Sequence, residues 1–106
     1  MYCGNYVGEI STIFLKGEVT FIITNNGEKY NIDAKLPSPM DKVKVVFSNI
    51  RQEDNSLLGI AKLSIMPKSE IESKITFEPE GKIKASMKVP KLGKVIIKRI
   101  RCVSNG

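Results

Sequence analysis

The chain has 106 residues, of which 42% are hydrophobic and 26% charged, with a formal net charge of +6. This length and composition are typical of one soluble globular domain, residues 1–106, and leave no room for a second domain beside it. No segment approaches the roughly 20 apolar residues of a membrane-spanning helix. The chain contains no histidine, which excludes Ser-His catalysis, Cys-His catalysis and His-metal sites within it.

The ends of the sequence bear on the compartment and on the two thiols. Residues 1–10 lack a basic region followed by an apolar run, so they show no export signal and we expect a cytoplasmic protein. Two cysteines, Cys3 and Cys102, cannot complete a structural zinc site alone, and free thiols are usual in the cytosol. Their crosslinking would test whether the first and last strands are neighbours. We predict no metal and no cofactor.

Apolar and polar residues alternate with a period of two along the chain, and no sustained helical stripe interrupts this pattern. The alternation predicts strands over residues 6–15, 18–24, 28–35, 42–50, 56–65, 71–78, 82–89 and 92–103. We expect a loop at 36–41, a turn at 51–55 and a short helical turn at 67–71. The connections are short, as in a meander of antiparallel strands.

The first readable hairpin turns at Asn26-Gly27, a pair that favours a two-residue type I′ turn. Such a loop fixes which residues face each other across the two strands. The predicted pairs are Ile23 with Tyr30, Phe21 with Ile32, Val19 with Ala34, and Thr20 with Asp33 on the outer face.

The second hairpin turns at residues 79–81, a three-residue loop ending in glycine. This loop suits a type I turn followed by a left-handed glycine bulge. The predicted pairs are Phe77 with Ile83, Ile75 with Ala85, Glu78 with Lys82, and Glu72 with Lys88. Apolar residues then meet on one face and opposite charges on the other, so the register is self-consistent.

Three segments resemble one another: residues 8–17, 59–67 and 81–90. Each begins with glycine and alternates for several residues before a Gly or Pro corner. A glycine at such a position often marks a bulge or a close backbone approach at the rim of a barrel. The similarity is consistent with internal duplication or simply with a meander of similar hairpins.

Eight short strands without a covering helix predict an all-β fold, because a flat sheet would leave a whole apolar face exposed. Closure of an eight-stranded antiparallel up-and-down meander into a small barrel buries that face and removes the edges. The alternative is a two-sheet β-sandwich of the same strands. An eight-stranded barrel is either filled by side chains or holds one small ligand.

The meander, the Gly8-Glu9-Ile10 start and the basic last strand resemble the calycin group, which includes lipocalins and small bacterial relatives. The chain is similar to short bacterial barrels of unknown function. This resemblance implies a calycin-like barrel whose interior binds a small, mostly apolar ligand. It also implies that Arg99 or Arg101 packs across the first strand. The chain has no tryptophan, and Ile10 stands where the group often carries one.

Together with this resemblance, the residues of the two hairpins that face inward are predicted to line a ligand site. These are Phe21, Ile23, Tyr30, Ile32, Ile75, Phe77, Ile83 and Met87. Both faces of the last strand are half apolar, so we expect a bulge that switches its parity. An inward Arg99 or Arg101 would anchor a ligand anion, or would instead cap the barrel by donating to backbone carbonyls.

The hairpin over residues 82–101 carries eight basic residues, no acidic residue and no aromatic residue. Its basic face comprises Lys82, Lys84, Lys88, Lys94 and Lys98. One interpretation is a solvated outer face, neutralised in part by Glu72 and Glu78 on the neighbouring strand. The other is a docking surface for an anionic partner. The lack of aromatic stacking platforms disfavours nucleic acid as that partner.

The sequence therefore predicts non-enzymatic binding of a small apolar or amphipathic ligand inside the barrel. The alternative is a protein- or polyanion-interaction module that uses the basic C-terminal hairpin. No motif supports catalysis: Glu53-Asp54 lies in a predicted turn, and no phosphate-binding glycine loop follows a strand. A homo-oligomer stays open, as does the identity of any ligand.

Overall fold

The computed structural model describes residues 4–13 and 15–104, which form eight β-strands and no helix. The strands in chain order are β1 (Gly4–Ser11), β2 (Lys16–Asn25), β3 (Tyr30–Lys35), β4 (Val45–Glu53), β5 (Ser56–Leu63), β6 (Met66–Phe77), β7 (Ile83–Val89) and β8 (Gly93–Ser104). Period-2 alternation predicted all eight, because the side chains of a strand point alternately to the two faces of the sheet.

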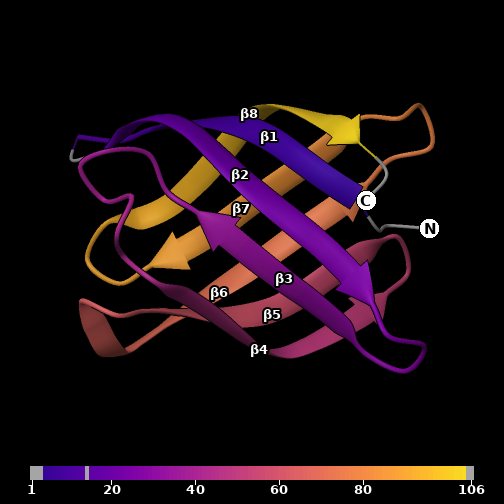
Figure 1. Cartoon of the computed structure of the whole chain (residues 1–106), viewed down its shortest axis with the longest axis horizontal. Helices are drawn as coiled ribbons and strands as arrows, with labels where there is room; N and C mark the ends of the chain where they lie inside the picture. The colour runs from indigo at the N-terminus through magenta and orange to yellow at the C-terminus, as the bar shows by residue number, and fades with distance from the viewer. Residues whose placement is uncertain (1–3, 14, 105–106) are drawn as a thin grey trace.

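All eight strands belong to one antiparallel sheet with the order β3-β2-β1-β8-β7-β6-β5-β4. Each strand pairs with its sequence neighbours except that β3 and β4 are the two ends of the sheet, and the first and last strands, β1 and β8, also pair with each other. The sheet curls until β3 and β4 lie side by side (Figure 1). The predicted all-β meander is confirmed, as a nearly closed barrel rather than a two-sheet sandwich.

The seam between β3 and β4 has no registered backbone pairing among the described residues. A long hydrogen bond of 3.5 Å crosses it, from the Tyr30 hydroxyl to Gln52 Oε1. The β3–β4 loop, residues 36–44, makes the turn from one edge of the sheet to the other. The barrel is therefore held closed at this seam by side chains rather than by a ladder.

The β6–β7 hairpin has the predicted register: Phe77 faces Ile83, Ile75 faces Ala85 and Glu72 faces Lys88. The turn is also as predicted. Gly81 has φ 82°, and its N–H donates to the Glu78 carbonyl at 3.0 Å. A left-handed glycine that closes a three-residue loop fixes the pairing of every residue that follows.

The predicted register of the β2–β3 hairpin is wrong by two residues. Ile23 faces Ile32 and Phe21 faces Ala34, so the last pair joins Asn25 to Tyr30 rather than to Glu28. The reason is the Asn26 side chain. Its Oδ1 accepts from the N–H groups of Glu28 at 3.3 Å and Lys29 at 2.9 Å, which stabilises a four-residue loop. A shift of two leaves the same side chains facing inward.

Several boundaries also differ from the sequence prediction: β1 ends at Ser11 instead of residue 15, and β4 begins at Val45 instead of residue 42. The helical turn expected at 67–71 is wrong, because β6 begins at Met66 and runs through it. Pro67 is the second residue of that strand, a position near a strand end where the missing N–H is tolerated. The turn expected at 51–55 is confined to Asp54 and Asn55, because β4 continues to Glu53.

Two glycines face bulges in the partner strand, as their positions at the start of similar segments suggested. Gly8 of β1 lies opposite two residues of β8, since Val7 pairs with Arg101 and Glu9 with Lys98. Gly59 of β5 likewise lies opposite two residues of β4, since Leu58 pairs with Arg51 and Ile60 with Ser48. The first bulged residue is left-handed in both cases, Arg99 and Asn49, each with φ 53°. The glycines leave room for the bulged backbone.

Candidate functional site

The two ends of the barrel differ in how their interiors are filled. At one end lie both termini and the β2–β3, β4–β5 and β6–β7 turns (Figure 1, right). There the Tyr6 ring stacks on Phe21 at 5.3 Å and meets Phe77 edge-on at 6.0 Å. Ile23 and Leu57 beside them are 0% and 1% exposed. We call this the termini end, and side chains fill it.

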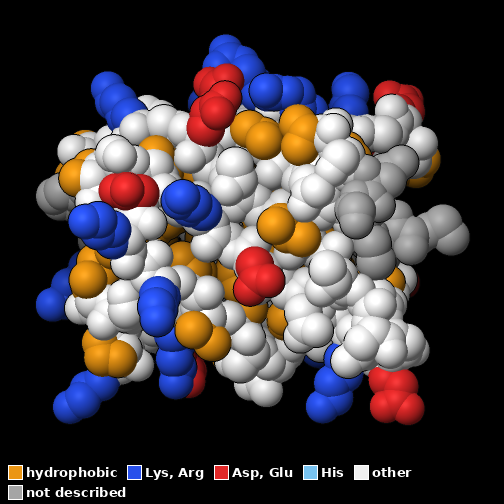
Figure 2. Space-filling view, in the orientation of Figure 1, with side chains coloured by type: hydrophobic (Ala, Val, Ile, Leu, Met, Phe, Trp, Pro, Cys, Tyr) orange, Lys and Arg blue, Asp and Glu red, His pale blue; other side chains and the backbone are white. Residues whose placement is uncertain are grey.

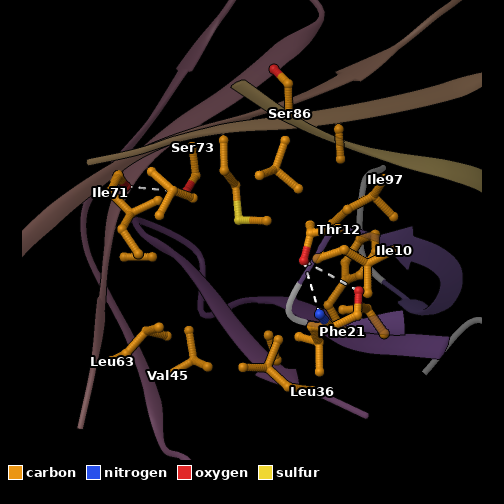
Figure 3. A pocket seen from close by; sticks show the side chains of 18 of the residues that line it. Ile10, Thr12, Phe21, Leu36, Val45, Leu63, Ile71, Ser73, Ser86 and Ile97 are labelled. Atoms are coloured by element: carbon orange, nitrogen blue, oxygen red, sulfur yellow. Dashed lines mark hydrogen bonds between the residues drawn. The ribbon is translucent and has the colours of Figure 1, made fainter. Parts of the chain in front are cut away.

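A cavity of about 380 Å³ occupies the other half of the barrel. It reaches the β1–β2, β3–β4, β5–β6 and β7–β8 loops, and we call this the cavity end. Figure 3 shows Val45 and Leu63 facing Ile10 and Phe21 across the open space. The exposed Met66 and Leu92 line the same cavity, so it opens to solvent between the loops.

Apolar side chains make almost the whole wall of this cavity. The buried or half-buried ones come from all eight strands and the β1–β2 and β3–β4 loops: Ile10, Leu15, Val19, Phe21, Ile32, Ala34, Leu36, Met40, Val45, Phe47, Ala61, Leu63, Ile71, Ile75, Ala85, Met87, Val89, Val95 and Ile97. Among the described lining residues Lys74 and Lys91 carry charge, and both are exposed. The interior therefore suits a molecule that is apolar over most of its surface.

Two of the polar lining groups, the hydroxyls of Thr12 and Ser73, already bond to the backbone. Thr12 Oγ1 accepts from the Leu15 N–H at 2.9 Å and so orders the β1–β2 loop. Ser73 Oγ donates to the Ile71 carbonyl at 3.2 Å (Figure 3). Both hydroxyls therefore have backbone partners within the wall of the barrel.

Half of the eight residues predicted to line a ligand site lie in the cavity wall, namely Phe21, Ile32, Ile75 and Met87. The other four face inward but pack at the termini end: Ile23, Tyr30, Phe77 and Ile83. Alternation tells which face a residue occupies, whereas its depth along the barrel decides whether it meets cavity or core. Ile83 and Phe77 flank the β6–β7 turn, far from the cavity end.

Sequence reasoning missed most of the wall, including Ile10, Phe47, Ala61, Leu63 and Val95. Each has the inward parity of its strand, and each lies between the middle of that strand and a loop at the cavity end. The signal was present as the same alternation in the less regular strands. To identify these residues as cavity lining, one must know how all eight strands align along the barrel axis, and the register of a single hairpin does not give that alignment.

The expectation of an interior arginine is corrected by the structure. Arg99 and Arg101 are both exposed, and neither lines the cavity. The predicted parity switch in β8 does occur at Arg99, where φ is 53°. It leaves Val95 and Ile97 buried before the bulge and turns Ile100 toward the core after it. The guanidinium of Arg99 instead pairs with Glu9 on the outer surface at 2.7 Å.

The predicted basic face is present on the outside of β7 and β8, but acidic residues interrupt it. Lys84 Nζ lies 3.0 Å from Glu78 Oε1. In the sheet register Lys88 is opposite Glu72, and Lys98 is opposite Glu9. Lys82 lies beside the β6–β7 turn, whereas Lys94 pairs with Lys88 at the cavity end. The five lysines are thus divided between the two ends.

Strands β1 and β8 are neighbours, with Tyr6 opposite Cys102, so the terminal strands meet as the crosslinking test supposes. Cys102 is exposed and its Sγ lies 3.3 Å from the Ser104 carbonyl. Cys3 lies outside the described residues. No cluster of three or more Cys, Asp or Glu side chains within the described part of the chain is arranged to hold a metal ion.

Comparisons of the chain with protein-family models, with curated proteins and with solved structures found no match. No helix in the described residues is long and apolar enough to cross a membrane. The case for function therefore depends on the geometry of the barrel, whose chemically distinctive feature is an apolar cavity open at one end.

Proposed function

We propose that this protein binds a small apolar or amphipathic ligand inside the cavity end of the barrel, without catalysing a reaction. The observation that carries this proposal is the cavity itself. Its volume of about 380 Å³ falls within the roughly 300–1,000 Å³ typical of ligand sites. The proposed role agrees with that implied by the resemblance to the calycin group.

The contrast between the two ends supports a guest rather than a packing defect. Unfilled apolar volume is destabilising, because the atoms that line it lose contacts they would otherwise make. The termini end shows that this chain can fill its barrel, with Ile23 and Leu57 almost wholly buried. At the cavity end small residues such as Ala61 and Ala85 face inward instead. An apolar guest would restore the missing contacts.

The wall also indicates the chemical class of the guest. The deep wall is aliphatic and aromatic, so a ligand buried there gains affinity from transfer of its apolar surface out of water. The Thr12 and Ser73 hydroxyls are weak hydrogen-bond partners for a polar group of the guest, because each already bonds to the backbone. A polar head group would instead lie at the mouth, near Lys91.

The first experiment is native mass spectrometry of the purified protein beside its denatured mass. An additional mass that is released on denaturation supports the proposal and gives the size of the ligand. A bare protein is then titrated with the apolar fluorophore N-phenylnaphthylamine, whose emission rises in a dry site. No extra mass together with no saturable fluorescence change would refute the proposal.

A pair of matched variants locates the binding. Ala61 is 1% exposed and lines the cavity, so Ala61→Phe places a ring inside it and should weaken probe binding about tenfold or more. Thr20→Phe adds the same ring on the exposed outer face of β2 and should leave binding unchanged. Equal effects of the two variants would show that the probe binds outside the barrel.

A further inference from the structure

The cavity end of the barrel carries exposed apolar side chains at the tips of its loops. Ile13 in the β1–β2 loop is 83% exposed and Ile65 in the β5–β6 turn is 59% exposed. Met66 beside it is 37% exposed, and Leu92 in the β7–β8 turn is 36% exposed. Three of the four loops at this end therefore present a large apolar group to solvent around the mouth of the cavity.

Lysines surround these loop tips. The cavity-end loops and the two residues on either side of each contain eight exposed lysines and one aspartate, Asp41. The lysines are Lys16, Lys35, Lys42, Lys44, Lys62, Lys88, Lys91 and Lys94. Figure 2 shows Lys and Arg side chains gathered over this end, on the left of the view, with hydrophobic side chains between them.

The termini end has the opposite balance. Counted in the same way, its three turns contain five acidic residues and three lysines. The acids are Glu28, Glu53, Asp54, Glu78 and Glu80, and the lysines are Lys29, Lys82 and Lys84. The net positive charge of the chain is therefore concentrated at the end where the cavity opens, and the field of the molecule orients that end toward an anionic surface.

We infer that the cavity end docks on an anionic lipid bilayer. Lysines near a negatively charged membrane gain electrostatic attraction, and apolar tips gain by entering the boundary between head groups and acyl chains. A nucleic acid or another hydrophilic polyanion fits this surface less well, because Ile13 and Ile65 would stay in water or meet phosphate. The combination of exposed apolar tips with a ring of lysines matches a partner that is anionic and apolar at once.

This docking places the mouth of the cavity against the bilayer, so a lipid-soluble guest could pass between the two without crossing water. That consequence rests on the proposed function, but the docking itself does not. The tips, the lysines and their position at one end are features of the surface alone. Membrane docking and ligand binding can therefore fail separately.

The test is flotation of the full-length protein with vesicles of phosphatidylcholine, with and without phosphatidylglycerol. We expect binding to the anionic vesicles, little binding to the neutral ones, and weaker binding as salt is raised. The double variant I13S/I65S should bind anionic vesicles about tenfold less well or worse, because both apolar tips are lost. The control I22S/V103S replaces the 43% and 53% exposed Ile22 and Val103, which lie elsewhere, and should bind like the parent.

A second pair tests the charge. Lys42→Glu with Lys91→Glu reverses two charges at the cavity end and should weaken binding, while Lys29→Glu with Lys82→Glu at the termini end should not. Absence of binding to anionic vesicles, or equal losses in test and control variants, would overturn the inference. Binding of I13S/I65S to heparin and to vesicles as tightly as the parent would also overturn it, in favour of a simple polyanion site. Probe binding should persist in I13S/I65S, and vesicle binding should persist in Ala61→Phe.

Discussion

Gly8 is the residue whose replacement most directly tests the closure of the barrel. It is buried in β1, opposite the bulge that Arg99 and Ile100 make in β8. A Cβ added at Gly8 would lie 2.5 Å from Ile97 Cγ2 and 2.9 Å from Ile100 Cγ1. Carbon atoms in contact normally lie about 3.5–4.0 Å apart. In Gly8→Ala the two isoleucines or the strands would therefore have to separate by about 1 Å at the nearest contact.

The cost of this separation can be estimated from the packing around it. Ile97 is 8% exposed and belongs to the core, so it cannot swing into solvent. Overpacking of this kind costs about 1–3 kcal/mol, and the reduced freedom of the unfolded chain returns about 0.4–1 kcal/mol. We expect a net loss of about 1–2 kcal/mol in the free energy of unfolding. For a domain of this size that corresponds to a decrease in Tm of roughly 4–16 °C.

The assay is urea unfolding followed by far-UV circular dichroism, with Gly59→Ala as the matched control. Gly59 faces the equivalent bulge in β4, but a Cβ there would lie 3.2 Å from Ile50 Cγ1 and 3.3 Å from the Ser48 carbonyl oxygen. Small shifts relieve those contacts, so Gly59→Ala should change stability by less than about 1 kcal/mol.

A double-mutant cycle tests the contact with Ile97 directly. Ile97→Leu removes the Cγ2 methyl, so the double variant with Gly8→Ala should lose less unfolding free energy than the sum of the two single variants. Equal stability of Gly8→Ala and the parent, or strict additivity with Ile97→Leu, would refute this account of the closure.

Three further predictions concern the core, the bulge and the Arg99–Glu9 ion pair. Leu57→Ala should lower the free energy of unfolding by about 2–5 kcal/mol, because Leu57 is 1% exposed at the tightly packed termini end; a loss below about 1 kcal/mol in urea unfolding would contradict that packing. Arg99 has φ 53°, so Arg99→Asn should be tolerated while Arg99→Val should cost about 1–3 kcal/mol. Equal Tm values for Arg99→Asn and Arg99→Val would contradict a left-handed residue at the bulge. The ion pair between Arg99 and Glu9 is largely exposed, so Glu9→Gln should change the free energy of unfolding by at most about 1 kcal/mol.

The β6–β7 and β2–β3 hairpins show what local sequence can and cannot determine. Gly81 is required by the left-handed turn it makes, so the loop length and the register after it were readable in advance. Asn26-Gly27 carried an equally strong turn signal, yet the Asn26 side chain accepts two backbone N–H groups and lengthens the loop to four residues. The competing loops differ in register by two residues and keep the same side chains inside, so the alternation could not distinguish them.

The last strand shows a second limit. Its two parities are equally apolar, which predicted a switch but not the residue at which it happens. The bulge falls at Arg99 because Gly8 on the neighbouring strand leaves space for Ile100. That space belongs to a residue some 90 positions away in the chain, and no local pattern reports it. This long-range contact turns the Arg99 side chain to the outer surface, so Arg99 cannot anchor a ligand inside the barrel.

The cavity was beyond reach of the sequence for a related reason. Most inward positions are apolar at both ends of the barrel, so composition does not mark one end as filled and the other as hollow. What differs is size and placement: the aromatic rings of Tyr6 and Phe77 meet at one end, while the smaller side chains of Ala61 and Val45 line the cavity at the other. Only the three-dimensional alignment of the strands brings these differences together.

This division of the barrel has a consequence for how the protein tolerates change. The termini end holds the stacked rings and the most deeply buried aliphatic side chains, so truncations there remove close contacts and act mainly on stability. At the cavity end the wall already lacks partners on its inner side, so a truncation such as Leu63→Ala removes fewer contacts and acts mainly on the volume and shape available to a guest. The same loops carry the apolar tips and most of the lysines. The end that contributes less to folding is therefore the end that is free to specialise in binding, and stability and binding should respond to different sets of substitutions.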